Sequence, residues 1–320
     1  MQSVTGIHHI TAIAGDPQEN LAFYQGVLGM RLVKRSINQD APDTYHLFFA
    51  DNAGNPGTDL TFFPWPHLGP GRQGAGNWGE VALTIPPGSS AYWQQRFDRF
   101  AVDYDARQQR FGETVLPFRD PHGMQLALIE TDLYDGFHYA AWSAGPVPAE
   151  YQIRGLGGVR LMVRSQEATA GFFSTALGFV AGESENGWQR YSVGQGVSGQ
   201  RFDLMVTSDA PRGEWGVGSV HHVAWRVPDQ EQGRAFRERI VQSGGRPTDS
   251  IDRFWFTSIY TREPGGALCE LATDGPGFSV DEELEKLGSS LVLPSWYEPQ
   301  RTQIEAGLPA LQDVDVETYR

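Results

Sequence analysis

The chain has 320 residues, of which 40% are hydrophobic and 20% charged, and its formal net charge is −14. Such a composition is typical of a folded globular protein with a sizeable core and excludes a disordered or fibrous chain. The excess of negative charge repels phosphate groups, which argues against nucleic acid and anionic membrane surfaces as partners.

The chain shows no signal for a membrane or a secretory route. No run approaches the roughly 18 apolar residues of a membrane span, and the first twenty residues lack the basic segment and apolar stretch of a secretory signal. The single cysteine, Cys269, cannot form an internal disulfide, which fits a reducing compartment. We therefore predict a cytoplasmic protein.

Four stretches of the chain share one pattern, in which a short apolar strand leads through a turn into an amphipathic helix. They begin at Gly6, Gly79, Gly155 and Ser219. The first helix carries a one-sided apolar stripe that includes Leu21, Tyr24 and Leu28. Gly29 and Gly178 follow the first and third helices, where a left-handed residue ends a helix.

Short β-rich runs follow each helix, as in TYHLFFAD and TDLTFFP after the first. Their alternation and the turn residues between them indicate hairpin-linked strands. Each unit is therefore β-α-β-β-β and about 65 to 75 residues long. The sequence predicts an α+β fold of four such units, whose paired sheets curl around shared cavities.

The repeats divide the chain into two halves. Units one and two form a predicted N-terminal module of residues 1–132, and units three and four a C-terminal module of residues 155–275. Residues 133–154 form the predicted connector, and residues 276–320 a C-terminal tail.

Comparing the four units position by position points to a metal site. The place of His9 on the first strand is taken by Glu80, Gly158 and His222 in the other units, and that of Glu270 on the last strand by Thr61, Ala127 and Asp203. Units one and four thus supply His9, His222 and Glu270 from matching places. Two imidazoles and one carboxylate are the ligand set of non-haem Fe(II) oxygenases, and the same set suits Mn(II).

Two further readings bear on these ligands. A carboxylate on an apolar strand, as at Glu270, costs several kcal/mol to bury unless it is paired or binds metal, and a salt bridge to Arg253 or Arg262 would also satisfy it. Strand alternation predicts that His9 and His222 face the cavity while His8 and His221 point elsewhere or lie at its edge.

The remaining histidines and the aromatic residues receive structural roles. We predict His46 in the core or the cavity wall, and His67, His122 and His138 at the surface. Glu80 and Asp203 have no neighbouring histidine and are predicted to form a polar cluster without metal. Phe48, Phe62, Trp225 and Trp255 lie on strands that could wall the cavity, where one or two of them would stack on a flat ligand, and most aromatic residues are predicted to belong to the core.

Several runs of the chain resemble a known family. GIHHITAIAGDPQENLAFYQGVLGMRLVKRSINQD, YHLFFAD, NPGTDLTFFP and SVHHVAWRVPD are similar to ring-cleaving dioxygenases of the vicinal oxygen chelate (glyoxalase/bleomycin resistance) superfamily, and most to its hydroquinone-cleaving branch. The likeness covers nearly the whole chain, including the tail GFSVDEELEKLGSSLVLPSWYEP. Catechol-cleaving relatives keep both histidines in their C-terminal half, whereas the third unit here has Gly157 and Gly158.

The resemblance implies a fold, a site and an activity. The fold is two tandem vicinal oxygen chelate modules, each of two βαβββ units, and the Fe(II) ligands are His9, His222 and Glu270. The residues around them that the resemblance implies are His8, Thr11, Arg253 and Tyr260. The implied reaction is cleavage of a hydroquinone-type aromatic diol by O2.

The residues suggest parts in that reaction. We expect Tyr260 and His8 to handle protons, and Arg253 to stabilise negative charge or orient Glu270. Without the resemblance, Tyr260 reads as a strand residue of the core and Arg253 as a surface ion-pair partner.

Two other functions stay open at this point. A glyoxalase-like isomerase or lyase would use Zn or Ni with a further carboxylate, where this chain has Thr61. A metal-free, resistance-type binding protein would need none of the three ligands. The identity of the diol is also open, exposed strand edges are compatible with a homo-oligomer, and the acidic tail would cover the cavity mouth or serve an interface.

Overall fold

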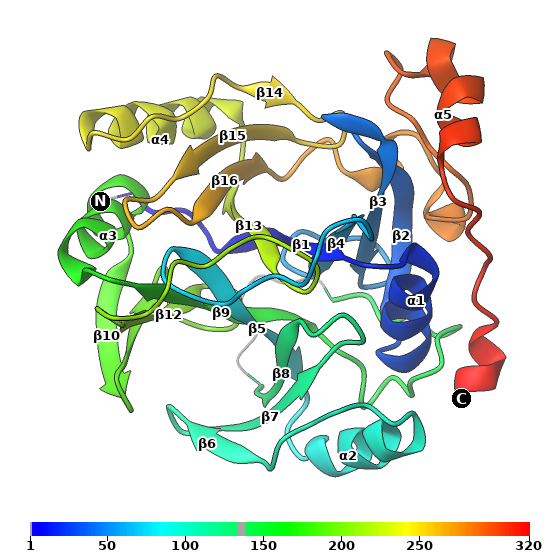
Figure 1. The fold of residues 1–320 in the computed structure, drawn as a ribbon, viewed down its shortest axis with the longest axis horizontal. Coiled ribbons are helices and arrows are strands. Elements are labelled where there is room, and N and C mark those ends of the chain that lie inside the picture. Colours follow the sequence, from blue (N-terminus) through cyan, green and yellow to red (C-terminus); the bar gives the residue numbers. More distant parts are fainter. Residues whose placement is uncertain (1, 133–138) are drawn as a thin grey trace.

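The computed structural model describes residues 2–132 and 139–320 and contains the four predicted units (Figure 1). Unit one comprises β1 (Ile7–Ala14), α1 (Pro17–Leu21) with the π-helical η1 (Ala22–Val27), β2 (Arg31–Asn38), β3 (Ala41–Ala50) and β4 (Asp59–Pro64). Unit two comprises β5 (Asn77–Ile85), α2 (Ser90–Arg99), β6 (Gln108–Arg110), β7 (Glu113–Arg119) and β8 (Gln125–Glu130).

The second half repeats the pattern. Unit three comprises β9 (Gly155–Val163), α3 (Gln166–Phe172) with the π-helical η2 (Phe173–Leu177), β10 (Val180–Glu185), β11 (Trp188–Ser192) and β12 (Arg201–Val206). Unit four comprises β13 (Val220–Val227), α4 (Gln230–Gln242), β14 (Ile251–Asp252), β15 (Thr257–Arg262) and β16 (Leu268–Thr273). The α+β prediction of four βαβββ units is confirmed, and Gly29 and Gly178 have the expected positive φ values of 67° and 82°.

The units pair into two curled, eight-stranded mixed sheets. The first has the order β14-β15-β16-β13-β1-β4-β3-β2 and joins units four and one, whereas the second has the order β10-β11-β12-β9-β5-β8-β7-β6 and joins units three and two. The antiparallel pairs β1–β13 and β5–β9 form the two seams between units. Each sheet takes strands from both halves of the chain, so the sheets do not divide the chain into an N-terminal and a C-terminal module. The module boundaries at residues 132 and 155 therefore stay a prediction.

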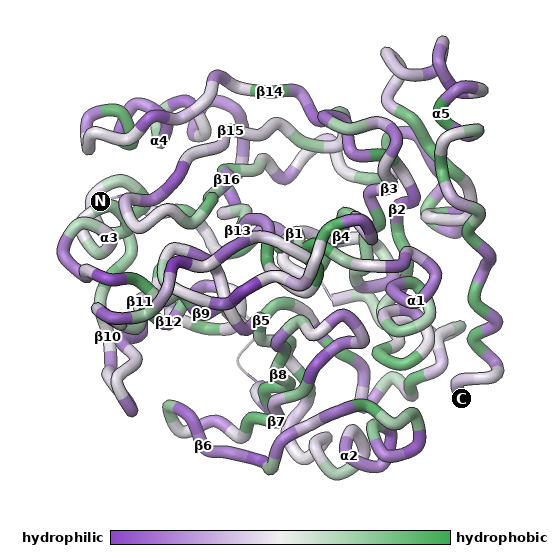
Figure 2. The backbone as a smooth tube through the Cα atoms, in the orientation of Figure 1, coloured by the Kyte–Doolittle hydropathy of each residue, from purple (hydrophilic) through white to green (hydrophobic). Residues whose placement is uncertain are grey.

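The hydrophobic core lies between the two sheets and under the helices. Trp78 of β5 and Trp225 of β13 meet there with ring centroids 6.0 Å apart, and the Trp78 indole donates a hydrogen bond to the carbonyl of Leu268 (2.7 Å). The outer helices α4 and α5 (Arg301–Gly307) alternate between hydrophilic and hydrophobic residues, as amphipathic surface helices do (Figure 2). No helix in the described part of the chain is long and apolar enough to cross a bilayer.

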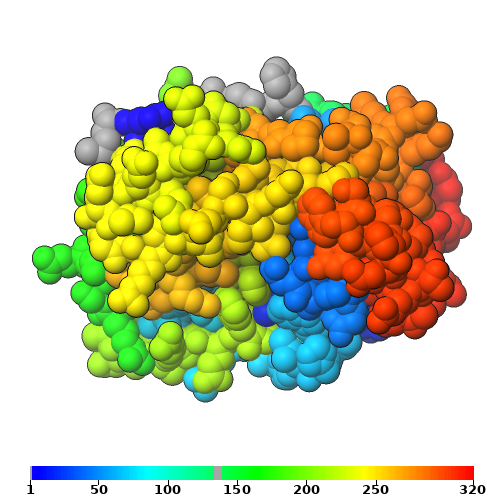
Figure 3. All heavy atoms as spheres, turned by 90° about the horizontal axis from the view of Figure 1, so that it is seen from above, coloured from blue at the N-terminus to red at the C-terminus, as the bar shows by residue number. Residues whose placement is uncertain are grey.

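The C-terminal tail packs against the β2–β3 hairpin, with the orange and red segment beside the blue one in Figure 3. Lys34 of β2 is fully buried beneath this segment, and its Nζ lies 2.7 Å from Asp281 and also pairs with Glu282. The same Nζ donates a hydrogen bond to the carbonyl of Phe278 (3.1 Å). The acidic part of the tail thus neutralises a cation that the hairpin buries.

Replacing Lys34 with methionine is expected to destabilise the protein, because the change keeps the apolar stem and leaves two carboxylates without their cation. Breaking a buried ion pair from one side costs about 3 kcal/mol or more. Urea unfolding should show this loss. The control is Lys286→Met, whose exposed pair with Glu283 should cost less than about 1 kcal/mol. Equal losses in the two variants would contradict this account of the tail.

Candidate metal centre

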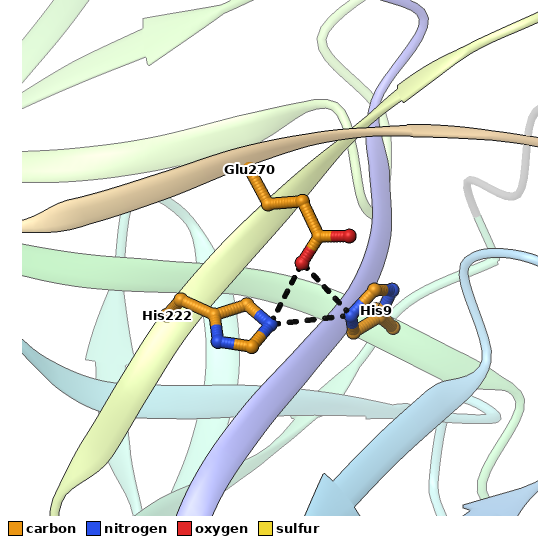
Figure 4. Close-up of side chains that lie close together, drawn as sticks. All are labelled: His9, His222 and Glu270. Carbon is orange, nitrogen blue, oxygen red and sulfur yellow. Dashed lines mark hydrogen bonds and ion pairs between the residues drawn. The ribbon is translucent and has the colours of Figure 1, made fainter. Parts of the chain in front are cut away.

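Three side chains from three strands of the first sheet meet at the seam between units one and four. His9 comes from β1, His222 from the adjacent antiparallel β13, and Glu270 from β16, which runs parallel to β13 (Figure 4). They form the only cluster of metal-ligating side chains among the described residues. The sequence prediction that these three residues converge is therefore confirmed.

The three donor atoms form a small triangle. The Nε2 atoms of His9 and His222 are 3.3 Å apart, and Glu270 Oε2 lies 3.4 Å from the first and 2.9 Å from the second. An ion about 2.1 Å from each donor would give donor–donor edges of roughly 3.0 to 3.4 Å. The residues therefore fit a divalent metal ion.

Glu270 is fully buried, and its environment accounts for its charge. Its Oε1 accepts a short hydrogen bond from Ser258 (2.5 Å), while Oε2 faces the two imidazoles. Burial alone would raise the pKa of this carboxyl, but His9 and His222 outweigh burial and hold the pKa well below its usual value. The carboxylate is thus ready to bind a cation.

Neither arginine considered from the sequence pairs with this carboxylate. Arg253 forms a bidentate pair with Asp40, at 3.1 and 2.8 Å. Arg262 donates to the carbonyl of Gly266 and lies over the ring of Trp215. The salt-bridge alternative for Glu270 is therefore wrong.

Each histidine pair lies at a β-bulge, which overturns the prediction that the two rings of a pair point apart. The register shifts by one residue between Ile7 and His9 on β1, and again where Val220 and His222 face β1. The residues on either side of each pair face the core, so both histidines of the pair lie on the opposite, cavity side. Alternation fails here because the extra residue of a bulge interrupts it.

The bulges bring the outer histidine of each pair against the inner one. His8 Nδ1 lies 2.9 Å from His9 Nδ1, and His221 Nδ1 lies 2.7 Å from His222 Nδ1. Burial, followed by the neighbouring imidazole, lowers the pKa of His8 and His221 well below the usual value, so both stay neutral.

One arrangement of protons satisfies both pairs. With a metal bound, the inner rings would donate from Nδ1 to the outer rings, which leaves their Nε2 lone pairs free to bind the ion. A histidine that binds metal through Nε2 is commonly fixed in this way by a partner at Nδ1. His8 and His221 thus orient the two imidazole donors.

In unit one, the position that corresponds to Glu270 of unit four is occupied by a threonine, Thr61. Thr61 of β4 pairs with Thr11, two residues after His9, as Glu270 pairs with the residue two after His222. The Thr61 hydroxyl lies 2.8 Å from that of Thr11 and 2.9 Å from His46 Nε2. The described chain therefore offers three strong ligands, with a hydroxyl and an imidazole beside the free positions.

Tyr260 and Arg253 lie together on the wall near Glu270. Tyr260 pairs with Glu270 across β15 and β16, and the Arg253 guanidinium lies 5.2 Å from the tyrosine ring centroid. Burial and the charge of Glu270 raise the pKa of the Tyr260 hydroxyl, so it keeps its proton at neutral pH. Burial opposes the charge of Arg253, but Asp40 outweighs it and raises the pKa of the guanidinium.

The centre opens into a cavity of about 490 Å³. Its walls include His46, Phe48, Phe63, Trp65, Trp255, Phe256 and Tyr260. Phe48 and Trp255 therefore lie where the sequence predicted, whereas Phe62 and Trp225 belong to the hydrophobic core. Strand parity places these last two on the opposite face of the sheet, which agrees with the expectation that most aromatic residues belong to the core.

The corresponding place in the second sheet is filled by ion pairs. Glu80 lies 2.5 Å from Arg110, and Asp203 accepts from Arg190 at 2.8 Å. Arg160 lies between them, within 4.0 Å of both carboxylates. The predicted polar cluster is thus present, with arginines against the carboxylates.

Three further histidines were predicted to lie at the surface. His67 is exposed as predicted, whereas the ring of His122 is only 6% exposed and faces Glu19, so its surface placement was wrong. His138 lies outside the described residues. Two residues of the site were not predicted: Ser258, which alternation from Tyr260 would have placed beside Glu270, and Asp40, for which the sequence carried no signal.

Comparison with known proteins places the chain among related sequences. The profile of the Glyoxalase/Bleomycin resistance protein/Dioxygenase superfamily matches residues 6–128 and 155–271. The chain is 43% identical over 303 residues to the “Putative ring-cleaving dioxygenase MhqO” of Bacillus subtilis strain 168, with 95% of each chain covered. It is 34% identical over 296 residues to a chlorohydroquinone/hydroquinone 1,2-dioxygenase of Sphingobium indicum, with 91% of each covered.

Solved structures give the same relationship. A crystal structure of a “putative dioxygenase” from Bacillus subtilis superposes with a TM-score of 0.91 at 41% identity, covering 98% of this chain and 99% of the other. Glyoxalase I from Zea mays superposes with a TM-score of 0.63 at 14% identity, over 84% of this chain and 92% of that one, which shows a shared fold.

Removing one imidazole donor is expected to abolish tight metal binding. His222→Ala should lower the affinity for Fe(II) or Mn(II) by more than about 100-fold, and His8→Ala by about 10- to 100-fold, because His8 orients a donor without binding the ion. Anaerobic calorimetric titration measures both. The control is His67→Ala, an exposed histidine outside the cavity. Unchanged affinity in His222→Ala would refute the site.

Asp59 is a buried carboxyl near His9 that should make stability depend on pH. Neither of its oxygens has a hydrogen-bond partner among the described residues, and burial raises its pKa to about 7. An unfolded aspartate titrates near pH 3.9. The folded protein therefore holds the extra proton between about pH 4 and 7, and stability falls as pH rises through that window.

Asp59→Asn should remove this dependence, because the amide stays neutral. In metal-free protein, the variant should gain roughly 4 kcal/mol over the parent between pH 4 and 8. Urea unfolding at several pH values measures the difference. Asp103→Asn, at an exposed carboxylate, serves as the control and should run parallel to the parent. If the free energy of unfolding of Asp59→Asn changed with pH as it does in the parent, Asp59 would not be the source of the pH dependence.

Proposed function

The chain belongs to the glyoxalase/bleomycin resistance protein/dioxygenase superfamily, and we propose that it is a metal-dependent dioxygenase that cleaves the ring of a hydroquinone-type aromatic diol with O2. The observation that carries the proposal is the buried triad of His9, His222 and Glu270 at the base of an aromatic-lined cavity. Three protein ligands leave positions open for a diol and O2, as in other non-haem Fe(II) oxygenases. We propose Fe(II) as the metal, with Mn(II) as the alternative that the same donors suit.

The metal would supply Lewis acidity toward a phenol oxygen and electrons toward O2. His9, His222 and Glu270 would hold it, and the cavity walls would keep the diol ring flat beside it. We propose that Tyr260, which stays protonated, donates a hydrogen bond and then a proton to oxygen atoms of the bound diol or O2. Arg253, held by Asp40, would stabilise negative charge that develops there.

His8 and Thr11 receive different roles. His8 does not line the cavity, since its ring lies behind His9 and bonds to it, so we propose that it positions that ligand. Thr11 is bonded to Thr61 and lies on the face of β1 that carries His9. We propose that the two hydroxyls give a polar edge to the open side of the centre.

Two other functions are less well supported. A glyoxalase-like isomerase would use a fourth protein ligand, and the corresponding residue here is Thr61. In a metal-free binding protein, burying the Glu270 carboxylate against two imidazoles would cost free energy without serving ligand binding. A homo-oligomeric state and a cytoplasmic location stay predictions.

Oxygen consumption tests the proposal directly. The protein is loaded with Fe(II) without oxygen, mixed with hydroquinone and then supplied with O2. We expect one O2 to be consumed per diol, with loss of the aromatic absorbance, and no consumption in His222→Ala. Turnover of a hemithioacetal without O2 uptake would instead support the isomerase. Diol binding that is equally tight in His222→Ala, without turnover, would support the binding protein.

Tyr260→Phe is expected to lower kcat by about 100-fold with little change in KM, because the ring remains and only the proton donor is lost. Steady-state oxygen uptake measures both constants. The matched control is Tyr191→Phe, a buried tyrosine of the second sheet that stacks on Phe202. An unchanged kcat in Tyr260→Phe would remove this residue from the mechanism.

A further inference from the structure

The cavity extends well beyond the space that one diol ring beside the triad needs. Thr61 and Phe63 lie two residues apart on β4, so their side chains leave the strand on the same face, and Trp65 follows directly after the strand ends. Two residues of a strand advance about 6.6 Å, so Phe63 lies about that far along β4 from Thr61, and Phe63 and Trp65 both line the cavity. The cavity volume of about 490 Å³ lies in the range of sites for drug-sized ligands.

One side of this cavity is an aromatic wall, formed by Phe63, Trp65 and His221. The Phe63 ring lies 5.2 Å from that of Trp65 and 5.4 Å from that of His221. The Trp65 indole donates a hydrogen bond to Thr44 (3.2 Å), which fixes its orientation. This wall offers flat apolar faces to whatever extends from the diol ring.

The same cavity has no unpaired charge to attract an ionic group. Among the described residues that line it, the charged side chains are Asp40 and Arg253, and these bind each other through two hydrogen bonds. Ile251 and Leu268 add apolar surface on the side of β14 and β16. An anionic substituent would therefore lose its hydration and meet a cation, Arg253, whose charge Asp40 already balances.

We propose that the substrate is a hydroquinone that carries a neutral apolar substituent larger than methyl, such as an aryl or branched alkyl group. The diol ring would lie beside the triad, and the substituent would pack against the aromatic wall. This inference rests on the proposed function, because it assigns the diol to the metal end of the cavity. The inference goes beyond the proposed function because it names Phe63 and Trp65 as the residues that select the substituent.

A series of diols tests the substrate class. Hydroquinone, methylhydroquinone, phenylhydroquinone and carboxymethylhydroquinone are compared with the Fe(II)-loaded protein by anaerobic calorimetry and by oxygen uptake. We expect kcat/KM for phenylhydroquinone to exceed that for hydroquinone by about 10-fold or more, since even small apolar groups change specificity by that factor. The carboxymethyl compound should bind no better than hydroquinone. Equal or weaker binding of phenylhydroquinone would overturn the inference.

Two substitutions test the wall itself. Trp65→Ala should lower the preference for phenylhydroquinone over hydroquinone, measured as the ratio of their kcat/KM values, by about 5-fold or more, because the substituent loses an aromatic contact. The matched control is Trp296→Ala, an exposed tryptophan that does not line the cavity, and it should leave the preference unchanged. Ile251→Trp should fill part of the cavity and exclude phenylhydroquinone while hydroquinone still enters. An unchanged preference in both cavity variants would refute the role of the wall.

The two proposals fail separately in this design. Absence of oxygen uptake with every diol, together with tight anaerobic binding of phenylhydroquinone, would overturn the dioxygenase proposal and support the ligand class. Rapid cleavage of hydroquinone with exclusion of phenylhydroquinone would support the dioxygenase and overturn the ligand class.

Discussion

The first sheet is organised around one buried carboxylate. Glu270 has no exposed surface, and burying an unpaired carboxylate would cost several kcal/mol. That cost is offset by Ser258 from its own unit and by two imidazoles, one of which comes from the other end of the chain. The carboxylate therefore constrains how β1 and β13 pair, because a one-residue slip would send His9 or His222 to the other face.

Comparing the two seams separates the backbone geometry of this centre, which both sheets share, from its side chains, which differ between them. In the second sheet the register of β5 and β9 shifts at the same two places, at Gly79–Glu80 and at Gly157–Gly158. The bulges are thus a property of the architecture, repeated at both seams. At one seam they carry histidine pairs whose Nε2 atoms face Glu270, and at the other they carry Glu80 and glycines, with arginines filling the space.

Sequence reasoning succeeded where a repeat could be compared with itself. The four units made His9, His222 and Glu270 visible as matching positions, and the strand registers bear out that matching. It failed where geometry departs from regular alternation. A bulge places His8 on the same side as His9, and no periodic pattern records an extra residue. A contact between distant loops, such as that of Asp40 with Arg253, produces no recognisable pattern in the sequence of either loop.

The mouth of the cavity is built by the same pairing of distant units as the centre itself. The turn after β2 supplies Gln39, whose amide donates to the carbonyl of Arg253, and Asp40, which holds the guanidinium. The hairpin is also tied to the tail, through Lys34 with Asp281 and through Tyr297, which donates a hydrogen bond to the carbonyl of Gln39. Contacts to Arg253 and to the tail thus hold this wall of the cavity in place. This preorganisation is what lets a cavity distinguish one substituent from another at little cost in ordering.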